Sequence, residues 1–418
     1  MFIFLCYIIL SPIILGLILF SSIFNAKIRT HLWDGRKSIK SAKSKINLSA
    51  KNKEIILFHA ASTGEYEQLK PILKEIDRAK YFVLLTFFSP TIFEKENQTE
   101  LVDAVCYHPF DLPWSAILFF IKLKPQKYII TRHDVWPFHI YFARFLGIQT
   151  ILINANLYSN SKRFSFGLTS FNGWLFHQFD LILTGSENLK NTILSLAPKS
   201  NVKITGDSRF DQVIQRSRNS RKDLLPSIFE NSLNIILGST VASDLPILSQ
   251  TFDELGNDFF NDDIRLIIVP HEVRDSDLIP LENLLREKGL SHQRITKFEE
   301  VNPPNILIVN KVGILADLYA YAKIAYIGAG FSTGVHSIIE PTVYKCVVVY
   351  GPRVDILDEA VEMTKMNAGV MIHNGNELAE VFEKIKHPAE IKKLGNRSYQ
   401  FLIEKEHAST RIINEIFN

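Results

Sequence analysis

Short apolar runs alternate with longer amphipathic segments along the first half of the chain. Residues 65–78 place Leu69, Ile72, Leu73 and Ile76 on one face of a helix. The apolar runs predict buried strands at residues 54–60, 81–87, 127–131, 150–154 and 180–184. Strands that alternate with helices in this way are typical of a parallel sheet covered on both faces.

A second series of the same kind follows a polar, basic stretch at residues 216–222, which we expect to be a linker. Its predicted strands are residues 234–237, 265–269, 305–309, 324–327 and 346–350. The pattern therefore predicts an α/β protein with two parallel domains that meet near residue 220. Ligands of open α/β sheets bind beyond the carboxyl ends of the strands, so we expect the site in the cleft between the domains.

The first 26 residues carry no charge and consist mainly of Ile, Leu and Phe. A helix over residues 1–26 would be about 39 Å long, enough to cross a hydrocarbon core of about 30 Å. A cleaved signal peptide is the weaker alternative, because no positive residue precedes the apolar stretch. Seven Lys or Arg residues lie between positions 27 and 45. The positive-inside rule then predicts a retained anchor with the following body in the cytoplasm.

Composition and charge separate the two halves of the chain. The 418 residues are 46% hydrophobic with a net charge of only +3, which argues against a disordered chain and against a nucleic-acid-binding protein. Residues 27–222 hold 29 basic and 16 acidic residues, a charge of +13, and the remainder carries −10. The asymmetry indicates an anionic partner for the first half. Cys6, Cys106 and Cys346 are too far apart to support a zinc or disulfide framework.

The first candidate for chemistry is residues 59–65 (HAASTGE), between the first predicted strand and its helix. The spacing of Ser62 and Glu65 is also that of a capping box, which is a purely structural arrangement. A helix N-terminus favours an ionised carboxylate, and such a group in a cleft accepts a proton from a hydroxyl nucleophile. The local sequence leaves both interpretations open.

A glycine-rich loop at residues 328–334 (GAGFSTG) follows another predicted strand and leads into residues 335–341 (VHSIIEP). We expect a helix to begin here, with His336 and Glu340 on one face and backbone N–H groups facing a phosphate. Such a pair would hold a phosphate and a ribose diol. A simple turn is the alternative, and a metal site is disfavoured because no third ligand is evident.

Four smaller clusters also follow predicted strands, and each by itself is typical of a solvated loop. They are residues 132–137 (RHDVWP), 238–240 (GST), 270–274 (PHEVR) and 350–353 (YGPR). The guanidinium of Arg274 is suited to a phosphate.

Taken in order, these motifs resemble those of the 3-deoxy-D-manno-octulosonic acid (Kdo) transferase family, membrane-anchored glycosyltransferases. Residues 59–65 match the family's H-A-x-S-x-G-E, and Trp136-Pro137 match its W-P. Residues 154–157 resemble its N-A-R-L, and residues 334–341 resemble its G-G-H-N-x-L-E-P. The chain departs from the family pattern at Arg132, Asn156, Ser337, Asn310 and Ile314, which indicates a divergent branch.

The resemblance implies a GT-B fold of two Rossmann-like domains and direct, inverting transfer of Kdo from CMP-Kdo to a phosphorylated lipid A precursor of the lipid IVA type, in lipopolysaccharide synthesis. Glu65 would be the general base, and neither a metal nor another cofactor would be needed. The implied donor-binding residues are Ser239, Thr240, His271, Arg274, Gly334, His336, Ser337 and Glu340. The implied acceptor or cleft residues are Ser62, Gly64, Asp134, Trp136 and Asn154.

The expected organisation is an anchor over residues 1–26, an acceptor-binding domain over 27–220, a CMP-sugar-binding domain over 221–395 and a final helix over 396–418. The anchor would hold the enzyme in the inner (cytoplasmic) membrane with a single pass. Two alternatives stay open: another GT-B enzyme that uses a UDP-sugar, either a transferase or an epimerase, and a non-catalytic scaffold at the membrane surface.

Overall fold

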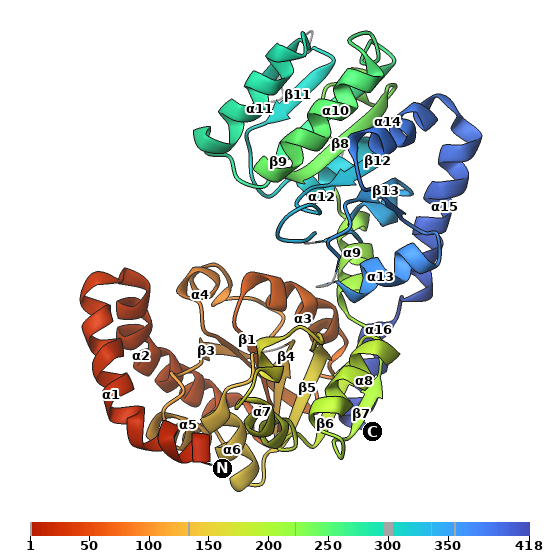
Figure 1. Cartoon of the computed structure of the whole chain (residues 1–418). Helices are drawn as coiled ribbons and strands as arrows, with labels where there is room; N and C mark the ends of the chain where they lie inside the picture. The colour runs from red at the N-terminus through yellow and green to blue at the C-terminus, as the bar shows by residue number, and fades with distance from the viewer. Residues whose placement is uncertain (1, 133, 222, 296–303, 336, 355–356) are drawn as a thin grey trace. The chain divides into compact units, whose positions relative to one another are not determined.

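The computed structural model describes residues 2–132, 134–221, 223–295, 304–335, 337–354 and 357–418. It contains two compact units: Met1–Gln212 together with His407–Asn418, and Val213–Glu406 (Figure 1). Each unit is built on a seven-stranded sheet whose strand pairings are parallel. The predicted α/β class with two parallel domains is confirmed.

The sheet of the amino-terminal unit has the order β3-β2-β1-β4-β5-β6-β7. Apolar clusters cover both of its faces, so its inner strands are continuous apolar runs instead of alternating ones. The strands are β1 (Glu54–Ala60), β2 (Tyr81–Phe87), β3 (Ala104–Tyr107), β4 (Lys127–Thr131), β5 (Gln149–Ala155), β6 (Leu181–Thr184) and β7 (Val202–Ile204). The helices before residue 212 are α1 (Phe2–Phe24), α2 (Ala26–Ser49), α3 (Thr63–Glu75), α4 (Pro90–Glu96), α5 (Pro113–Leu123), α6 (Pro137–Phe145), α7 (Thr169–Phe176), α8 (Glu187–Leu196) and the start of α9 (Arg209–Arg218).

The sheet of the carboxy-terminal unit has the order β10-β11-β9-β8-β12-β13-β14 and encloses its own apolar core. Its strands are β8 (Leu233–Thr240), β9 (Ile264–Pro270), β10 (His292–Ile295), β11 (Ile306–Val309), β12 (Ala322–Ile327), β13 (Val347–Tyr350) and β14 (Val370–Met371). Its helices are α10 (Leu245–Leu255), α11 (Asp275–Glu287), α12 (Leu315–Leu318), α13 (Asp358–Lys365), α14 (Gly375–Glu383) and α15 (Pro388–Glu404).

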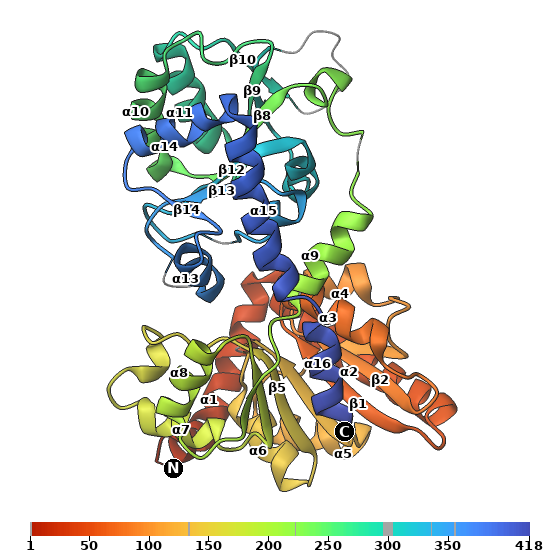
Figure 2. The same cartoon turned by 90° about the vertical axis from the view of Figure 1, so that its right-hand side faces the viewer.

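Two predicted connections differ from the structure. The stretch expected as a linker is helical through Arg218, because α9 continues into it and places Arg216 and Arg218 in its last turn, where cations favour a helix. The single helix expected over residues 396–418 is two helices, α15 and α16 (Ala408–Phe417), separated at His407, whose φ is +67°. Helix α16 lies against the amino-terminal unit (Figure 2). Its Ile412 and Ile416 are buried in the core there.

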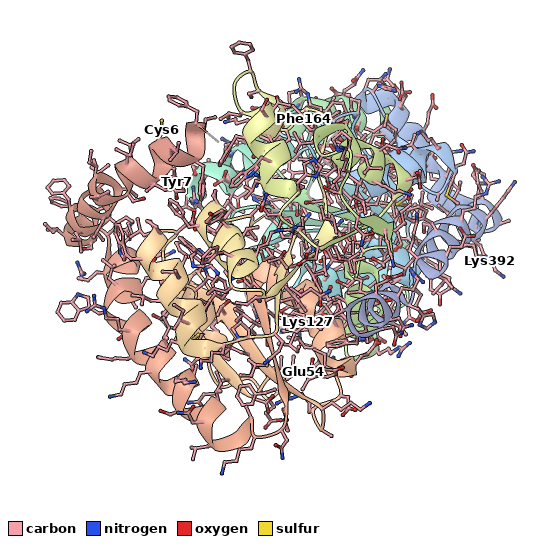
Figure 3. All side chains as sticks on the ribbon, turned by 90° about the horizontal axis from the view of Figure 1, so that it is seen from below. Cys6, Tyr7, Glu54, Lys127, Phe164 and Lys392 are labelled. Atoms are coloured by element: carbon pink, nitrogen blue, oxygen red, sulfur yellow. The ribbon has the colours of Figure 1, made fainter. Side chains whose placement is uncertain are left out.

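The apolar helix α1 is the one described helix that is long and apolar enough to cross a membrane by length and composition. Its first turns are packed against the amino-terminal unit. Phe4 is buried against Phe138 and Trp174, with ring centroids 5.2 and 5.0 Å away. Tyr7 stacks on Phe138 and donates a hydrogen bond to Asp111 Oδ2 at 3.2 Å, on the side of α1 that faces the unit (Figure 3). The basic flank after it is the long helix α2, which packs on β3.

Candidate functional site

Glu65 lies in the first turn of α3, directly after β1, and both halves of the predicted capping box are present. Its Oε2 accepts hydrogen bonds from the backbone N–H groups of Ala61 at 2.6 Å and Ser62 at 3.1 Å. The Ser62 hydroxyl accepts from the Glu65 N–H at 3.4 Å. The carboxylate is buried, whereas Ser62 and Gly64 above it are exposed. The capping box therefore fixes the buried Glu65 in the same helical turn as the exposed Ser62 and Gly64.

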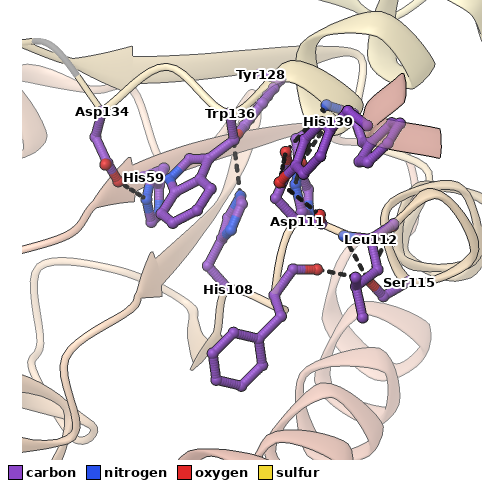
Figure 4. A network of polar contacts seen from close by, with 12 residues as sticks. His59, His108, Asp111, Leu112, Ser115, Tyr128, Asp134, Trp136 and His139 are labelled. Carbon is purple, nitrogen blue, oxygen red and sulfur yellow. Dashed lines mark hydrogen bonds and ion pairs between the residues drawn. The ribbon is translucent and has the colours of Figure 1, made fainter. Parts of the chain in front are cut away.

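Asp134 follows β4 and is held from two directions (Figure 4). Its Oδ2 accepts a hydrogen bond from His59 Nε2 at 2.8 Å and one from Trp136 Nε1 at 2.7 Å. His59 is fully buried near the end of β1, and its Nδ1 lies 3.0 Å from the Thr86 hydroxyl. Because β1 and β4 are neighbours at the point where the strand order reverses, the loops with Glu65 and Asp134 flank the place where such sheets bind ligands.

A column of buried imidazoles, which the motifs did not reveal, begins at His59 and continues through His108 to His139 (Figure 4). The His108 ring is 4.0 Å from that of His59 and 4.1 Å from that of His139. Burial lowers the pKa of both His108 and His139, and the Asp111 carboxylate opposes it at His139. Asp111 Oδ1 lies 2.8 Å from His139 Nδ1 and also accepts from two N–H groups at the start of α6. The column thus connects the candidate site to the helix that packs against α1.

Asn154, expected among the cleft residues, is buried and bonded within the fold. Its Oδ1 accepts from the Ser208 N–H at 3.0 Å, and its Nδ2 donates to the Ser208 hydroxyl at 2.8 Å. Its φ of +50° interrupts the pairing of β5 with β6. Asparagine tolerates this left-handed conformation. Through its two hydrogen bonds to Ser208, the side chain joins β5 to the start of α9.

In the carboxy-terminal unit the glycine-rich loop meets the end of β8. Gly328 packs so closely on this strand that a Cβ would lie 2.5 Å from the Ser239 carbonyl oxygen and 2.7 Å from Thr240 Cα. Gly330 packs equally closely on Gly351, and Ser239 itself has a φ of +56°. Strands β8 and β12 are the pair at which this second sheet reverses its order. The clusters at residues 238–240, 328–334 and 350–353 therefore form one backbone surface at the carboxyl ends of adjacent strands.

Asp244 is a buried residue at this surface that the sequence motifs missed. It accepts hydrogen bonds from the Ala329 N–H at 3.0 Å, from the Val241 N–H at 2.9 Å and from the Tyr326 hydroxyl at 2.9 Å. Burial raises the pKa of Asp244, and these hydrogen bonds oppose the rise. The sequence signal that could have indicated Asp244 is its position, four residues after Thr240 in the turn that follows a strand end containing glycine.

The helix expected after the glycine-rich loop is absent from the described residues. Gly334, with a φ of +98°, ends the turn, Ile338 and Ile339 form bends, Glu340 lies in a turn, and a short 3-10 helix spans Pro341–Tyr344. Proline is favoured in a first helical turn and disfavoured inside a helix, so Pro341 sets the start later than expected. His336 lies outside the described residues. Glu340 is half-buried, and burial raises its pKa while the Arg216 guanidinium opposes the rise.

His271 and Arg274 follow β9 and are both exposed. Arg274 lies 3.3 Å from the Glu272 carboxylate, and the backbone N–H of His271 donates to the Thr240 carbonyl at 2.9 Å. That second bond ties the β9 loop to the surface around residues 238–240. Within the described parts of the chain, no group of three or more His, Cys, Asp or Glu side chains is arranged to hold a metal ion.

Solved structures with the same architecture include an epimerase and a glycosyltransferase. A putative UDP-N-acetylglucosamine 2-epimerase from Listeria monocytogenes matches 87% of this chain and 96% of its own, with a TM-score of 0.64 and 11% identity. A glycosyltransferase from Rickettsia africae matches 88% of this chain and 98% of its own, with a TM-score of 0.59 and 13% identity. At this identity the likeness shows the fold alone, and that fold is of the GT-B class.

Sequence relatives specify the family. Residues 22–212 match the model of the 3-deoxy-D-manno-octulosonic-acid transferase (kdotransferase) family. Transferases of this name from Aquifex aeolicus, Chlamydia muridarum and Haemophilus influenzae are 29%, 26% and 24% identical, over 79%, 78% and 88% of this chain and 86%, 77% and 88% of theirs. The chain is therefore similar to Kdo transferases over most of its length, which confirms the resemblance seen in the motifs, and the protein is a glycosyltransferase.

Proposed function

We propose that this enzyme transfers Kdo from CMP-Kdo to a phosphorylated lipid A precursor of the lipid IVA type, with Glu65 as the general base. The observation that carries the proposal is the position of Glu65. Its carboxylate is fixed by the N–H groups of Ala61 and Ser62 at the reversal point of the first sheet, one residue after the exposed Gly64. A carboxylate fixed in this way is oriented before the substrate arrives.

The proposed chemistry is a single displacement. The acceptor hydroxyl gives its proton to Glu65 as its oxygen attacks the anomeric carbon of Kdo. The bond from that carbon to the phosphate oxygen of CMP breaks, CMP leaves, and the configuration inverts. Asp134 and Trp136 would contact the acceptor sugar, with Asp134 oriented by His59. No metal is proposed, because the leaving group is a monophosphate and no diphosphate needs to be bridged.

The carboxy-terminal unit is proposed to bind CMP-Kdo at the backbone surface of residues 238–240, 328–334 and 350–353. Its glycines let a phosphate approach backbone N–H groups closely. The proposed contacts are those of the family motif and its neighbours: Ser239, Thr240, His271, Arg274, Gly334, His336, Ser337 and Glu340. Glu340 would accept hydrogen bonds from the ribose hydroxyls.

The proposed location is the inner membrane, with α1 as a single-pass anchor and the catalytic body in the cytoplasm. The support is the length and apolar composition of α1 and the basic residues of α2 that follow it. These basic residues also suit a membrane surface and an acceptor that both carry phosphate.

The test is mass spectrometry of lipid IVA after incubation with CMP-Kdo and the purified full-length protein. Wild-type protein is expected to add Kdo, and Glu65→Gln is expected to lose about 100-fold in rate, since general base catalysis contributes about 10²–10⁴-fold. The glutamine amide oxygen still accepts from the Ala61 and Ser62 N–H groups, so the capping box persists. Retention of more than a tenth of wild-type activity would refute the base assignment.

Glu67→Gln is the matched control. Glu67 lies two residues after Glu65 on the same helix, and its carboxylate pairs with Lys70 at 2.6 Å. Its activity is expected to equal that of the wild type. Competition between CMP and UDP for the donor site separates the proposal from a UDP-sugar enzyme: CMP should inhibit at lower concentration. Absence of transfer by the wild-type protein would favour the non-catalytic alternative.

A further inference from the structure

An open groove of about 640 Å³ lies within the amino-terminal unit between α1, α2 and α5. Its walls are mainly apolar: Leu15 comes from α1, Ile39 from α2, and Trp114 and Leu118 from α5. Leu118 is 62% exposed and Trp114 is 38% exposed, so both present apolar surface to this space. Gly35 of α2 lines the groove without a side chain, which widens it at the middle.

All charged residues that line the groove are basic. Arg36, Lys40 and Lys122 are exposed at its edge, and no Asp or Glu belongs to the lining. An apolar trough with cations at its rim complements an amphiphile that has an apolar chain and an anionic head. Because Leu15 belongs to the apolar helix α1, whose outer face is exposed, the groove opens beside the segment expected to enter the membrane.

His31 adds a polar feature to the groove wall. Its side chain is buried, and its Nδ1 lies 2.9 Å from the carbonyl oxygen of Phe88, so Nδ1 carries the proton that this hydrogen bond requires. Burial lowers the pKa of His31, and backbone hydrogen bonds at Phe88 and His108 oppose this shift, so the neutral ring is favoured. Nε2 is then an acceptor, and it has no hydrogen-bond partner among the described residues. A hydroxyl group that reached Nε2 would satisfy it by donating a hydrogen bond.

Aromatic contacts connect the groove to the candidate site. Phe110 lines the groove and meets Phe88 edge-on, with ring centroids 5.4 Å apart. Phe88 lies 5.2 Å from Trp136, which donates to Asp134. The groove and the Asp134 loop therefore share one aromatic wall, and a lipid whose chain occupies the groove has its polar end in the same unit as Glu65.

We propose that this groove binds a hydroxyl-bearing acyl chain of the anionic lipid acceptor, with the chain along Leu118 and Gly35 and the chain hydroxyl donating to His31 Nε2. Arg36, Lys40 and Lys122 face its anionic end. The inference rests on the proposed function for the identity of the lipid as acceptor. The binding of the chain itself is measurable without donor or transfer.

The test uses the full-length protein in a neutral maltoside detergent, with cis-parinaric acid as a fluorescent groove probe. Displacement of this probe by 3-hydroxytetradecanoate is compared with displacement by tetradecanoate. The hydroxy acid is expected to bind at least fivefold more tightly. In His31→Phe the two acids should bind equally, because the acceptor nitrogen is gone and the apolar wall remains. Equal binding of the two acids by the wild type would overturn the role of His31.

Two further variants separate the groove from general surface effects. Arg36→Glu with Lys40→Glu should weaken both acids at least tenfold, whereas Lys37→Glu with Lys45→Glu, the same charge change at exposed α2 positions outside the groove, should not. If both double variants lost the same affinity for the two acids, net charge alone would explain the effect. That result would overturn the proposed groove site. Gly35→Leu should abolish probe binding by filling the groove, since a Cβ there meets only Tyr107 Cβ at 4.0 Å. Unchanged probe binding in Gly35→Leu would also overturn the proposal.

Whether the groove binds the acceptor during transfer is measured separately, in the transfer assay. Gly35→Leu should raise KM for the acylated acceptor and leave KM for its de-acylated form unchanged. If wild-type protein binds the hydroxy acid but transfers no Kdo, the proposed function fails and chain binding stands. If transfer occurs with an unchanged KM in Gly35→Leu, the proposed function stands and the groove is not an acceptor site.

Discussion

His59 Nε2 donates a 2.8 Å hydrogen bond to Asp134 Oδ2, and this bond joins the carboxyl ends of β1 and β4. His59 is fully buried, whereas the Asp134 side chain is 22% exposed. One partner therefore belongs to the core and the other to the candidate site. Trp136 Nε1 donates to the same oxygen at 2.7 Å, so two side chains of the fold set the orientation of this carboxylate.

Removing the Asp134 carboxylate should destabilise the fold more than neutralising it. Asp134→Ala leaves the buried His59 Nε2 without its acceptor and should lower the free energy of unfolding by about 1–3 kcal/mol. Asp134→Asn keeps an acceptor oxygen and should lose less than half as much. Urea denaturation of the two variants measures the difference. Equal losses would mean that the His59 contact does not contribute to stability.

Neutralising Glu340 should change how stability depends on pH. Burial raises its pKa above the ordinary value of 4.5, so the folded chain holds the carboxyl proton to higher pH than the unfolded chain does. The free energy of unfolding therefore falls as pH rises from about 4.5 through the folded pKa. Glu340→Gln removes this titration, and its urea midpoint relative to wild type should rise over that range. Glu380→Gln, at an exposed position of α14, is the control and should show no such trend.

A methyl group at Gly328 should disrupt the proposed donor surface. In Gly328→Ala the new Cβ meets backbone atoms of Ser239 and Thr240 at 2.5 and 2.7 Å, and backbone cannot move aside as a side chain can. We expect a loss of about 1–3 kcal/mol in stability, as for other overpacked sites, with weaker binding of CMP by calorimetry. Gly64→Ala is the control for stability, because nothing lies within 4 Å of its Cβ. A Gly328→Ala protein with wild-type stability and CMP affinity would contradict the described packing.

Asp211 should hold the last helix in place. Its two carboxylate oxygens accept from the N–H groups of His407 at 2.7 Å and Ser409 at 2.6 Å, at the start of α16. Asp211→Ala should lower stability by about 0.5–2 kcal/mol, as the loss of a helix cap does. Hydrogen exchange should become faster in α16 and stay unchanged in α15. Faster exchange throughout both units would instead indicate a global effect.

The inner strands of both sheets could be predicted from the sequence, and the edge strands could not. Residues 54–60 and 81–87 coincide with β1 and β2, because strands covered on both faces are continuous apolar runs. The four strands that were missed, β3, β7, β10 and β14, are the edges of the two sheets, and each has only two to four residues. Segments of two to four residues are too short to show a period, even where most positions are buried, as in β3.

The parts of the candidate site formed by residues close in sequence could be predicted. The parts formed by residues on two neighbouring strands could not. The capping box of Ser62 and Glu65 was visible because both residues lie within one helical turn. The bond between His59 and Asp134 was not, because it depends on β1 and β4 being neighbours. The helix expected at His336 failed for a local reason: Pro341 sets the start of the helical turn.

Because α16 packs on the amino-terminal unit, that unit cannot complete its core until α16 has been translated. Ile412 and Ile416 complete the core around β1 and α3, yet they are translated only after the whole of the carboxy-terminal unit. At about 5–20 residues per second, the amino-terminal unit waits on the order of 10–40 s for its final helix while the other unit is made. During that interval the apolar surface that α16 will cover is open, so the first unit to be translated is the last to be finished.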